Sequence, residues 1–342
     1  MEASVRIAVV GVGLIGGSVA LAARERCGAR VTGWDPEPGA AASACDVAAA
    51  DVASAVADAE LIFVACPLDV LPARVIDVLG VCAPDAIVTD VGSAKSRLCA
   101  AIDDPRFIGG HPMAGAETSG VQHARSDLFN DAIWYLTPDG GTEGVRLERL
   151  TRFIAAIGAR PRAIDPADHD RLMAGVSHVP HILANLLVDG VGDEITSAGP
   201  SFRDATRVAG ANPPLWRSIY LENSEAIIAS LDTVAERLAD VRAMLAAADG
   251  DALEAWQVQA AERRASVDAA LTGERVEEVR VVVPNRPGVL ADLALALGRE
   301  AINIHDLSLS PSADNSSGEV AIWVPTSSAG RARELIEEVL TR

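Results

Sequence analysis

Lysine is almost absent from this sequence. Its 342 residues include one lysine, Lys95, and 28 arginines, and acidic residues outnumber basic ones 48 to 29, which gives a formal charge of −19. A field of that sign repels polyanions, so nucleic acid and anionic membrane surfaces are not expected partners. If the substrate is a small anion, a few local arginines must bind it against the charge of the whole molecule.

Cysteine is also scarce and is poorly placed for metal or redox chemistry. The five cysteines are odd in number, fall in the first third of the chain and form no C-x-x-C pair (Cys27, Cys45, Cys66, Cys82 and Cys99). This spacing argues against a disulfide framework and favours buried thiols in a reducing compartment.

Long apolar runs are missing too. The apolar stretch at residues 7–23 is interrupted by glycines and is not followed by a small-residue cleavage site, so it does not match a signal peptide. No other segment approaches the roughly 20 apolar residues that a membrane span requires. The sequence therefore predicts a cytoplasmic protein.

What is present is the composition of an ordinary globular protein. Hydrophobic residues make up 49% and charged residues 23%, and the length suits two or three domains. In the first part, short β-rich runs alternate with helical stretches, which predicts an α/β domain with a mainly parallel, Rossmann-like sheet. The expected strands are residues 6–10, 30–34, 61–65, 86–90, 106–109 and 132–137.

The pattern changes twice farther along the chain. From about Pro166 the strand signal ends and helical periodicity takes over, in segments 168–189, 214–248 and 251–271. After Gly273 strands return, at 276–283, 304–310 and 319–325, with helices at 288–300 and at the end. The sequence therefore predicts three domains: residues 1–165, an all-helical domain at 166–273, and a small α+β module at 277–342.

A glycine-rich loop follows the first expected strand and opens a helix. Residues 11–16 read G-V-G-L-I-G, the G-x-G-x-x-G pattern of dinucleotide sites, and the strand-helix context makes the match specific. Gly11 would allow the tight turn, Gly13 the approach of a pyrophosphate, and Gly16 close packing of helix on strand, while helix amides bind the anion. A glycine-rich turn that binds nothing is the alternative. The expected cofactor contacts in this loop are Gly11, Gly13, Leu14, Ile15 and Gly16.

An acidic residue ends the second expected strand. Asp35 lies 19 residues after Gly16, where its carboxylate would accept hydrogen bonds from ribose hydroxyls. A 2′-phosphate would meet the charges of Asp35 and Glu37, and no arginine follows closely in the sequence, so NAD is favoured over NADP. A turn aspartate before Pro36 is the alternative.

Two polar motifs come at the carboxyl ends of later strands. Residues 90–95, D-V-G-S-A-K, carry Ser93, and residues 110–117, G-H-P-M-A-G-A-E, carry His111 and Glu117. Ligands bind at this edge of an open parallel sheet, so the three side chains are expected near the nicotinamide. His111 is the expected acid-base group because a neutral imidazole accepts a proton near neutral pH. A hydrogen-bonded structural histidine is the alternative.

The helical region carries further polar groups. His178 and His181 lie three residues apart on one helix face, but the zinc spacing and a third ligand are missing, so no metal site is predicted. Arg203 and Arg207 are four residues apart and on a helix could hold a dicarboxylate together. A solvated arginine pair is the alternative. Trp216 follows shortly afterwards.

Taken in order, the motifs resemble those of a known protein family. The runs GVGLIGGS, DVGSAK, GGHPMAGAE, SHVPH and SFRDATRVA followed by NPPLW resemble the prephenate dehydrogenase family over about residues 7–223. The remainder, with P-N-R-P-G-V-L at 284–290 and I-N-I at 302–304, resembles an ACT domain, an amino-acid-binding module. The resemblance implies a Rossmann-like NAD-binding domain, a helical dimerisation and substrate domain, and a ferredoxin-like ACT domain.

The resemblance also implies an activity, the NAD-dependent oxidative decarboxylation of prephenate to 4-hydroxyphenylpyruvate in tyrosine biosynthesis. By the family pattern, His111 deprotonates the ring hydroxyl, Ser93 orients that hydroxyl, and Arg207 binds a substrate carboxylate. The remaining positions implied to line the pocket are Arg203, His181, Glu117 and Trp216. One departure stands out: Ala116 occupies a position where the family commonly has Ser or Thr, so a hydroxyl that could contact substrate is missing.

Three alternatives remain open. Arogenate dehydrogenase differs only in the amino group of its substrate's side chain, and the motifs do not separate the two. A β-hydroxyacid dehydrogenase of the 6-phosphogluconate type would use a lysine in the helical region, where this chain has none. A catalytically dead amino-acid sensor would not need His111 and Arg207, which are intact.

The C-terminal resemblance implies regulation by an aromatic amino acid, with tyrosine the expected effector. The residues expected to border that ligand are Asn285, Arg286, Gly288, Val289, Leu290 and Asn303. A dimerisation module without a ligand is the alternative. The three long helices carry more apolar surface than one small bundle needs, and the family dimerises through this region, so a homodimer is expected.

Overall fold

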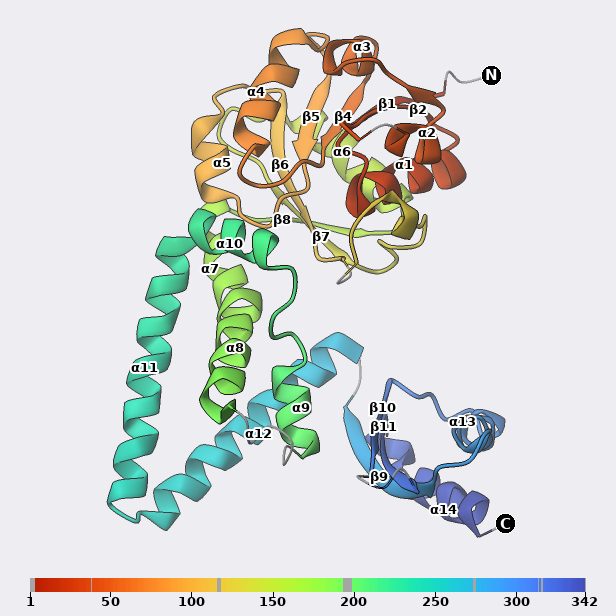
Figure 1. The fold of residues 1–342 in the computed structure, drawn as a ribbon, viewed down its shortest axis with the longest axis vertical. Helices are drawn as coiled ribbons and strands as arrows, with labels where there is room; N and C mark the ends of the chain where they lie inside the picture. The colour runs from red at the N-terminus through yellow and green to blue at the C-terminus, as the bar shows by residue number, and fades with distance from the viewer. Residues whose placement is uncertain are drawn as a thin grey trace. The chain divides into compact units, whose positions relative to one another are not determined.

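The fold was analysed in a computed structural model of the chain. The structure describes residues 4–37, 39–115, 118–192, 199–272, 275–312, 314 and 316–341. By its contacts the chain separates into two compact units, residues 1–234 and 235–342, and each is described by itself below. Figure 1 shows the elements of both units in chain order.

Within the described residues, an eight-stranded sheet forms the first part of unit 1, in the order β3-β2-β1-β4-β5-β6-β7-β8. All neighbours pair in parallel except β6 and β7, which are antiparallel. The strand bounds are Arg6–Val10, Arg30–Trp34, Val47–Ala48, Leu61–Val64, Ile87–Asp90, Phe107–Pro112, Ile133–Thr137 and Arg160–Ala163. The order 3-2-1-4 places a topological switch point between β1 and β4, where open α/β sheets bind ligands.

Both faces of this sheet are covered, as a parallel sheet requires. Alternate strand residues enter different cores: Ile7 and Val9 of β1 belong to one core, and Ala8 and Val10 to the other. Helices α1, α2 and α6 cover the first face, and α3, α4 and α5 the second (Figure 1). Their bounds are Leu14–Cys27, Ala40–Ala44, Gly144–Ala156, Val52–Val56, Leu71–Val81 and Ser96–Ala101. The predicted Rossmann-like α/β architecture is confirmed.

The sheet contains two strands that the sequence pattern did not predict. Strand β8 reads R-P-R-A and lacks the alternating apolar pattern; it forms at the edge of the sheet, where Pro161 is tolerated. Strand β3 has only two residues. Strand β6 also continues past the expected end at residue 109 to Pro112, because His111 pairs with Tyr135 of β7. His111 therefore lies within a strand, not beyond its end.

Helices follow the sheet, as expected from about Pro166 onwards. The first expected helical segment is not one regular helix, because a five-residue π turn, η2 (Ala174–His178), separates α7 from α8. Pro180 lies at the start of α8, and its ring would clash with the carbonyl four residues earlier in a regular helix, which accounts for the widened turn. The bounds are α7 Pro166–Met173, α8 Val179–Val191, α9 Pro200–Thr206, α10 Pro213–Glu222 and α11 Ser224–Ala246.

The sequence was not expected to contain a segment that could span a membrane. Among the described residues, however, one helical stretch, Pro166–Val191, is long and apolar enough to do so. It also carries His169 and Asp170, both buried and both hydrogen-bonded within unit 1. These contacts are those of a helix packed inside a folded domain.

Unit 2 contains α12 (Gly250–Thr272) and a small α+β module. In the part of this unit that the structure describes, three antiparallel strands lie in the order β10-β11-β9, with bounds Asp306–Pro311, Ser317–Pro325 and Val276–Pro284. Helices α13 (Val289–Arg299) and α14 (Ala329–Leu340) pack on one face, where Leu293 and Leu297 meet the strand residues Val320 and Ile322. The opposite face is open, and Val282 is 65% exposed there. This is the expected α+β module.

Candidate active site

The glycine-rich loop lies at the switch point of the sheet. Gly11 has a φ of +94°, and a Cβ there would come within 2.5 Å of the Ala65 carbonyl oxygen. A Cβ on Gly16 would come within 1.9 Å of the Gly11 oxygen, so both positions require glycine for the fold itself. Gly13 differs, because nothing lies within 4 Å of its Cβ position at the N-terminus of α1. The loop therefore leaves open space where the amides of Leu14 and Ile15 begin a helix, and this fits a pyrophosphate.

Asp35 connects this loop to the end of β2. Its Oδ2 accepts a hydrogen bond from the Val12 amide at 2.6 Å, and its Oδ1 accepts one from the Glu37 amide at 2.8 Å. The Arg74 guanidinium of α4 lies 5.1 Å from the centre of the Trp34 ring, immediately before Asp35. An arginine is thus close to this corner in space, although none follows Asp35 closely in the sequence.

Asp90 and Lys95 form an ion pair whose side chains are fully buried. Asp90 also accepts hydrogen bonds from the Gly92 amide at 2.7 Å and the Gly110 amide at 2.9 Å, while the Lys95 ammonium donates to the Gly110 carbonyl at 2.9 Å. The pair therefore joins the loop that holds Ser93 to the strand that holds His111. Ser93 is half-buried in this loop, between β5 and α5.

His111 is the first member of a chain of three polar side chains. Its Nδ1 lies 2.9 Å from Nε2 of His169, and Nδ1 of His169 lies 2.8 Å from Oδ1 of Asp170. His169 and Asp170, both on α7, are buried, whereas His111 is half-buried. Burial lowers the pKa of His111 well below its ordinary value, and repulsion from the protonated forms of His169 and His178 and from Lys95 adds to this effect. His111 is therefore neutral at physiological pH.

Asp170 is held as a carboxylate by three hydrogen bonds to its side chain. Besides His169, its oxygens accept bonds from the Lys95 amide and the Ser96 amide, each at 2.8 Å. Burial alone would raise the pKa of Asp170, but the bonds from His169, Ser96 and Lys95 outweigh it and lower the pKa. The Asn223 amide donates to the Asp170 backbone carbonyl at 2.9 Å. Helix α7 is thereby fixed against the loop that follows Ser93.

The π turn places His178 in the same buried region. Its Nδ1 accepts a hydrogen bond from the Asn223 side chain at 3.0 Å, and its ring packs edge-on against Trp216, with 6.1 Å between centroids. Burial lowers the pKa of His178 to about 4, partly opposed by the carboxylate of Asp170. His178 is also neutral at physiological pH.

His181 stacks on Trp216, with the ring centroids 3.6 Å apart and the planes 8° from parallel. Its Nδ1 accepts from the Asn185 side-chain amide at 3.2 Å and also contacts the Tyr220 hydroxyl. Asn185 is oriented by a bond from the Gly210 amide to its Oδ1, so its nitrogen faces His181. Since Nδ1 is an acceptor, neutral His181 carries its proton on Nε2.

That Nε2 is buried without a hydrogen bond of ordinary length and angle among the described residues. Burial lowers the pKa of His181, and hydrogen bonding to the backbone of Val208 opposes the shift.

The predicted arginines lie on and just after α9, which packs beside α8 (Figure 1). Arg203 is in the last turn, Arg207 is the residue that ends the helix, and both side chains are exposed. A cavity of about 730 Å³ runs alongside, and its lining includes Thr206, Asn185 and Tyr220. The latter two residues contact His181, and Thr206 and Ala209, which lie close to Arg207 in the sequence, also line the cavity. Glu117 and Ala116 lie outside the described residues.

Sequence reasoning gave no role to His169, Asp170, Asn223 or Tyr220. Each is an ordinary helix residue in the sequence, and only packing brings them to His111, His178 and His181. The adjacent His169-Asp170 pair, just after the helix start at Pro166, is the one local signal that could have pointed to acid-base chemistry.

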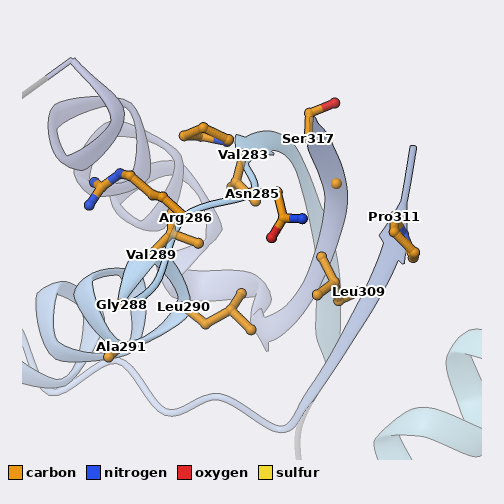
Figure 2. A pocket seen from close by; sticks show the side chains of 12 residues that line it. Val283, Asn285, Arg286, Gly288, Val289, Leu290, Ala291, Leu309, Pro311 and Ser317 are labelled. Carbon is orange, nitrogen blue, oxygen red and sulfur yellow. The ribbon is translucent and has the colours of Figure 1, made fainter. Parts of the chain in front are cut away.

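A second cavity, of about 290 Å³, lies in unit 2 at the start of α13. Its lining includes five of the expected regulatory residues, Asn285, Arg286, Gly288, Val289 and Leu290, together with Leu309, Pro311 and Ser317. Figure 2 shows the Asn285 amide between the loop and Leu309, whereas the Arg286 guanidinium points away. Asn303 is exposed and does not line this cavity.

Three family models match the chain in succession. They are the prephenate dehydrogenase nucleotide-binding domain over residues 19–162, the prephenate dehydrogenase dimerization domain over 165–259 and the ACT domain over 278–340.

Curated relatives agree with these models. A prephenate dehydrogenase of Bacillus subtilis is 29% identical over 338 residues, covering 92% of this chain and 91% of the relative. A cyclohexadienyl dehydrogenase of Zymomonas mobilis is 33% identical, covering 72% of this chain and 90% of the relative.

Solved structures give the same result. A prephenate dehydrogenase from A. aeolicus, in complex with hydroxyphenyl propionate and NAD+, has a TM-score of 0.73 and 27% identity, covering 78% of this chain and 99% of that chain. An arogenate dehydrogenase from Synechocystis has a TM-score of 0.69 and 29% identity, covering 76% and 98%. With its nucleotide-binding, helical and ACT regions in this order, the chain belongs to the prephenate dehydrogenase family.

Proposed function

We propose that the chain is an NAD-dependent dehydrogenase that oxidatively decarboxylates prephenate to 4-hydroxyphenylpyruvate in the cytoplasm, as a step of tyrosine biosynthesis. The observation that carries the proposal is a neutral His111 held by His169 at the carboxyl edge of the sheet. A base is needed there because the substrate hydroxyl must lose its proton as the ring carbon is oxidised.

The cofactor is held by the loop at the switch point of the sheet. The open position at Gly13 and the first amides of α1 fit a pyrophosphate, and Asp35 is placed for the ribose hydroxyls. Since Asp35 and Glu37 would repel a 2′-phosphate, NAD is the proposed cofactor. When bound, its nicotinamide supplies the acceptor for a hydride.

In this proposal the substrate binds between His111 and His181. His111 accepts the proton of the ring hydroxyl, which Ser93 orients. Arg207 binds a carboxylate, with Arg203, Trp216 and Glu117 as further pocket residues. His181, stacked on Trp216, is a further proposed pocket residue.

Prephenate is the first choice of substrate, in keeping with the prephenate dehydrogenases among the relatives and solved structures. Arogenate is the second candidate, and the arogenate and cyclohexadienyl dehydrogenases among the relatives support testing it.

The test is NADH formation by the purified chain with prephenate and with arogenate, each with NAD and with NADP. We expect turnover of prephenate with NAD, and loss of at least about 100-fold in kcat for His111→Asn, the usual contribution of a general base. His123→Asn, an exposed histidine in η1 (Val121–His123), is the matched control. Turnover of arogenate alone would reverse the choice of substrate, and turnover of neither would reject the function.

The second cavity is the proposed site of feedback regulation by tyrosine. The residues at the start of α13 line this cavity, where the N-terminus of a helix suits an amino-acid carboxylate, and Leu290 and Leu309 offer an apolar wall. The helical region matched by the dimerization model, with exposed Leu186, Leu187 and Trp256, is the proposed homodimer interface.

A further inference from the structure

The positions of the hydrogen atoms along the Asp170, His169 and His111 chain follow from the donors and acceptors around it. Asp170 accepts bonds from two backbone amides, so it is an acceptor toward His169 as well, and Nδ1 of His169 carries a proton. In its neutral form His169 then has a bare Nε2, which accepts the proton on Nδ1 of His111. His111 is consequently left with a bare Nε2.

This arrangement has a chemical consequence, which rests on the proposed function above. We propose that His169, backed by Asp170, fixes His111 in the tautomer with a bare Nε2, receives the Nδ1 proton of His111 when Nε2 takes up the substrate proton, and later returns it. His169 and Asp170 are positioning residues in this scheme, because they act on the substrate only through His111.

The proton movements balance without solvent. As the hydride leaves the ring carbon, the hydroxyl O–H bond breaks and an H–Nε2 bond forms on His111, while the Nδ1 proton of His111 moves to Nε2 of His169. Loss of the ring carboxylate as CO2 sends its electron pair through the ring to the oxygen. That oxygen takes the proton back from His111 Nε2 as His169 returns its own proton to Nδ1.

The surroundings favour the cation on His169 over His111. The charged and titratable groups among the described residues that act on the pair are Lys95 with its partner Asp90, His178 from the π turn, Tyr135 of β7 and Asp170. Lys95 disfavours a charge on His111. Asp170 is the anion in direct contact with His169, at 2.8 Å. A cation formed on the pair is therefore stabilised at His169.

The first test needs neither substrate nor cofactor. In the full-length protein labelled with 15N-histidine, His111→Asn and His169→Gln assign the two rings, and long-range 15N–1H spectra report which nitrogen of each ring carries the proton. We expect a protonated Nδ1 and a bare Nε2 for both residues in the wild type. A proton on Nε2 of His111 would overturn the inference, whatever the substrate is.

The second test is the pH profile of kcat/KM for Asp170→Asn. Asp170 stabilises the protonated pair and thereby raises its apparent pKa, so its removal should move the acid limb to lower pH and reduce kcat at least tenfold. If Asp170 had only a structural role, Asp170→Asn would lower activity without moving the acid limb of the profile. That result would refute the proposed proton transfer between His111 and His169. Asp168→Asn makes the same change two residues away, at an exposed side chain that pairs with Arg171, and should leave the profile unchanged.

The two proposals can fail separately. If the wild type oxidises neither prephenate nor arogenate, the proposed function is wrong, while the NMR measurement still decides the tautomers. If turnover is normal but His111 carries its proton on Nε2, the relay is wrong and the function stands. Should Asp170→Asn fail to fold, the wild-type NMR measurement decides alone.

Discussion

Asp90 and Lys95 form a fully buried ion pair, and together they bond both the amide and the carbonyl of Gly110, the residue before His111. The only lysine of the chain thus supports the base without facing the substrate. Removing one partner of a buried ion pair is costly, because the remaining charge stays buried without its counter-charge.

The first prediction follows from that pair. Lys95→Met should lower the free energy of unfolding by about 3 kcal/mol, because Asp90 would remain buried without its counter-charge. Urea denaturation at pH 7 measures the change. The double variant Asp90→Asn/Lys95→Met should lose less than the single variant, since it removes both charges. A double variant that is less stable than Lys95→Met would contradict this account.

The second prediction distinguishes the role of Gly13 from that of Gly16 in the glycine-rich loop. Gly13→Val should leave the melting temperature nearly unchanged, because the position is open and its φ is −85°, yet weaken NAD binding at least about tenfold by blocking the approach of the pyrophosphate. Gly16→Ala should lower the melting temperature, since its Cβ would meet the Gly11 carbonyl. Calorimetry and NAD titration check both, and equal NAD affinity for Gly13→Val and wild type would count against the site.

The third prediction concerns pH. In the folded protein the pKa of His178 is lowered to about 4, and in the unfolded chain it is about 6.5. The unfolded state therefore binds more protons between these values, so the stability is complete above pH 6.5 and falls as the pH drops toward 4. The contribution of His178 is at most roughly 3 kcal/mol.

Urea denaturation at pH 7 and pH 5 tests this. His178→Gln keeps an acceptor for Asn223 but cannot be protonated, so it should lose less stability on acidification than the wild type. His123→Gln, the same substitution at an exposed site, should behave as the wild type does. An unchanged pH dependence in His178→Gln would rule out this histidine as the source.

The fourth prediction addresses regulation. Asn285→Ala should reduce inhibition by tyrosine at least about tenfold without changing kcat, because the amide borders the second cavity and is remote in sequence from the catalytic residues. Inhibition curves with purified protein give the result. Val282→Ser, at an exposed position of β9, the strand that precedes Asn285, and outside the cavity, is the control. Unaltered inhibition in Asn285→Ala would place the effector elsewhere.

The sequence was most informative where local patterns determine structure. Strands β1 and β2 begin and end where predicted, because apolar runs bounded by charged or turn residues specify them, and the glycine spacing identified the loop. Strand β8 was missed because its charged, proline-containing sequence becomes a strand only by pairing with β7.

The candidate site was predictable only in part, for the same reason. His111 could be singled out because it comes directly after two glycines near the carboxyl end of a strand, at the ligand-binding edge of the sheet. Its partner His169 lies 58 residues later, on a helix with no distinguishing pattern, and the contact depends on how α7 packs against the sheet. The hydrogen-bond donors and acceptors that determine the tautomers of His111 and His169 are likewise brought together by tertiary packing, which residue spacing in the sequence does not predict.

The hydrogen bond between His111 and His169 also crosses from one matched domain to the next, from β6 to α7. A fragment ending before Pro166 would retain the whole nucleotide loop but would leave the imidazole of His111 without its orienting neighbour. Dinucleotide binding and the function of His111 as a base therefore depend on different parts of the polypeptide. A redesign that disturbs the contact between β6 and α7 would abolish the reaction and leave dinucleotide binding intact.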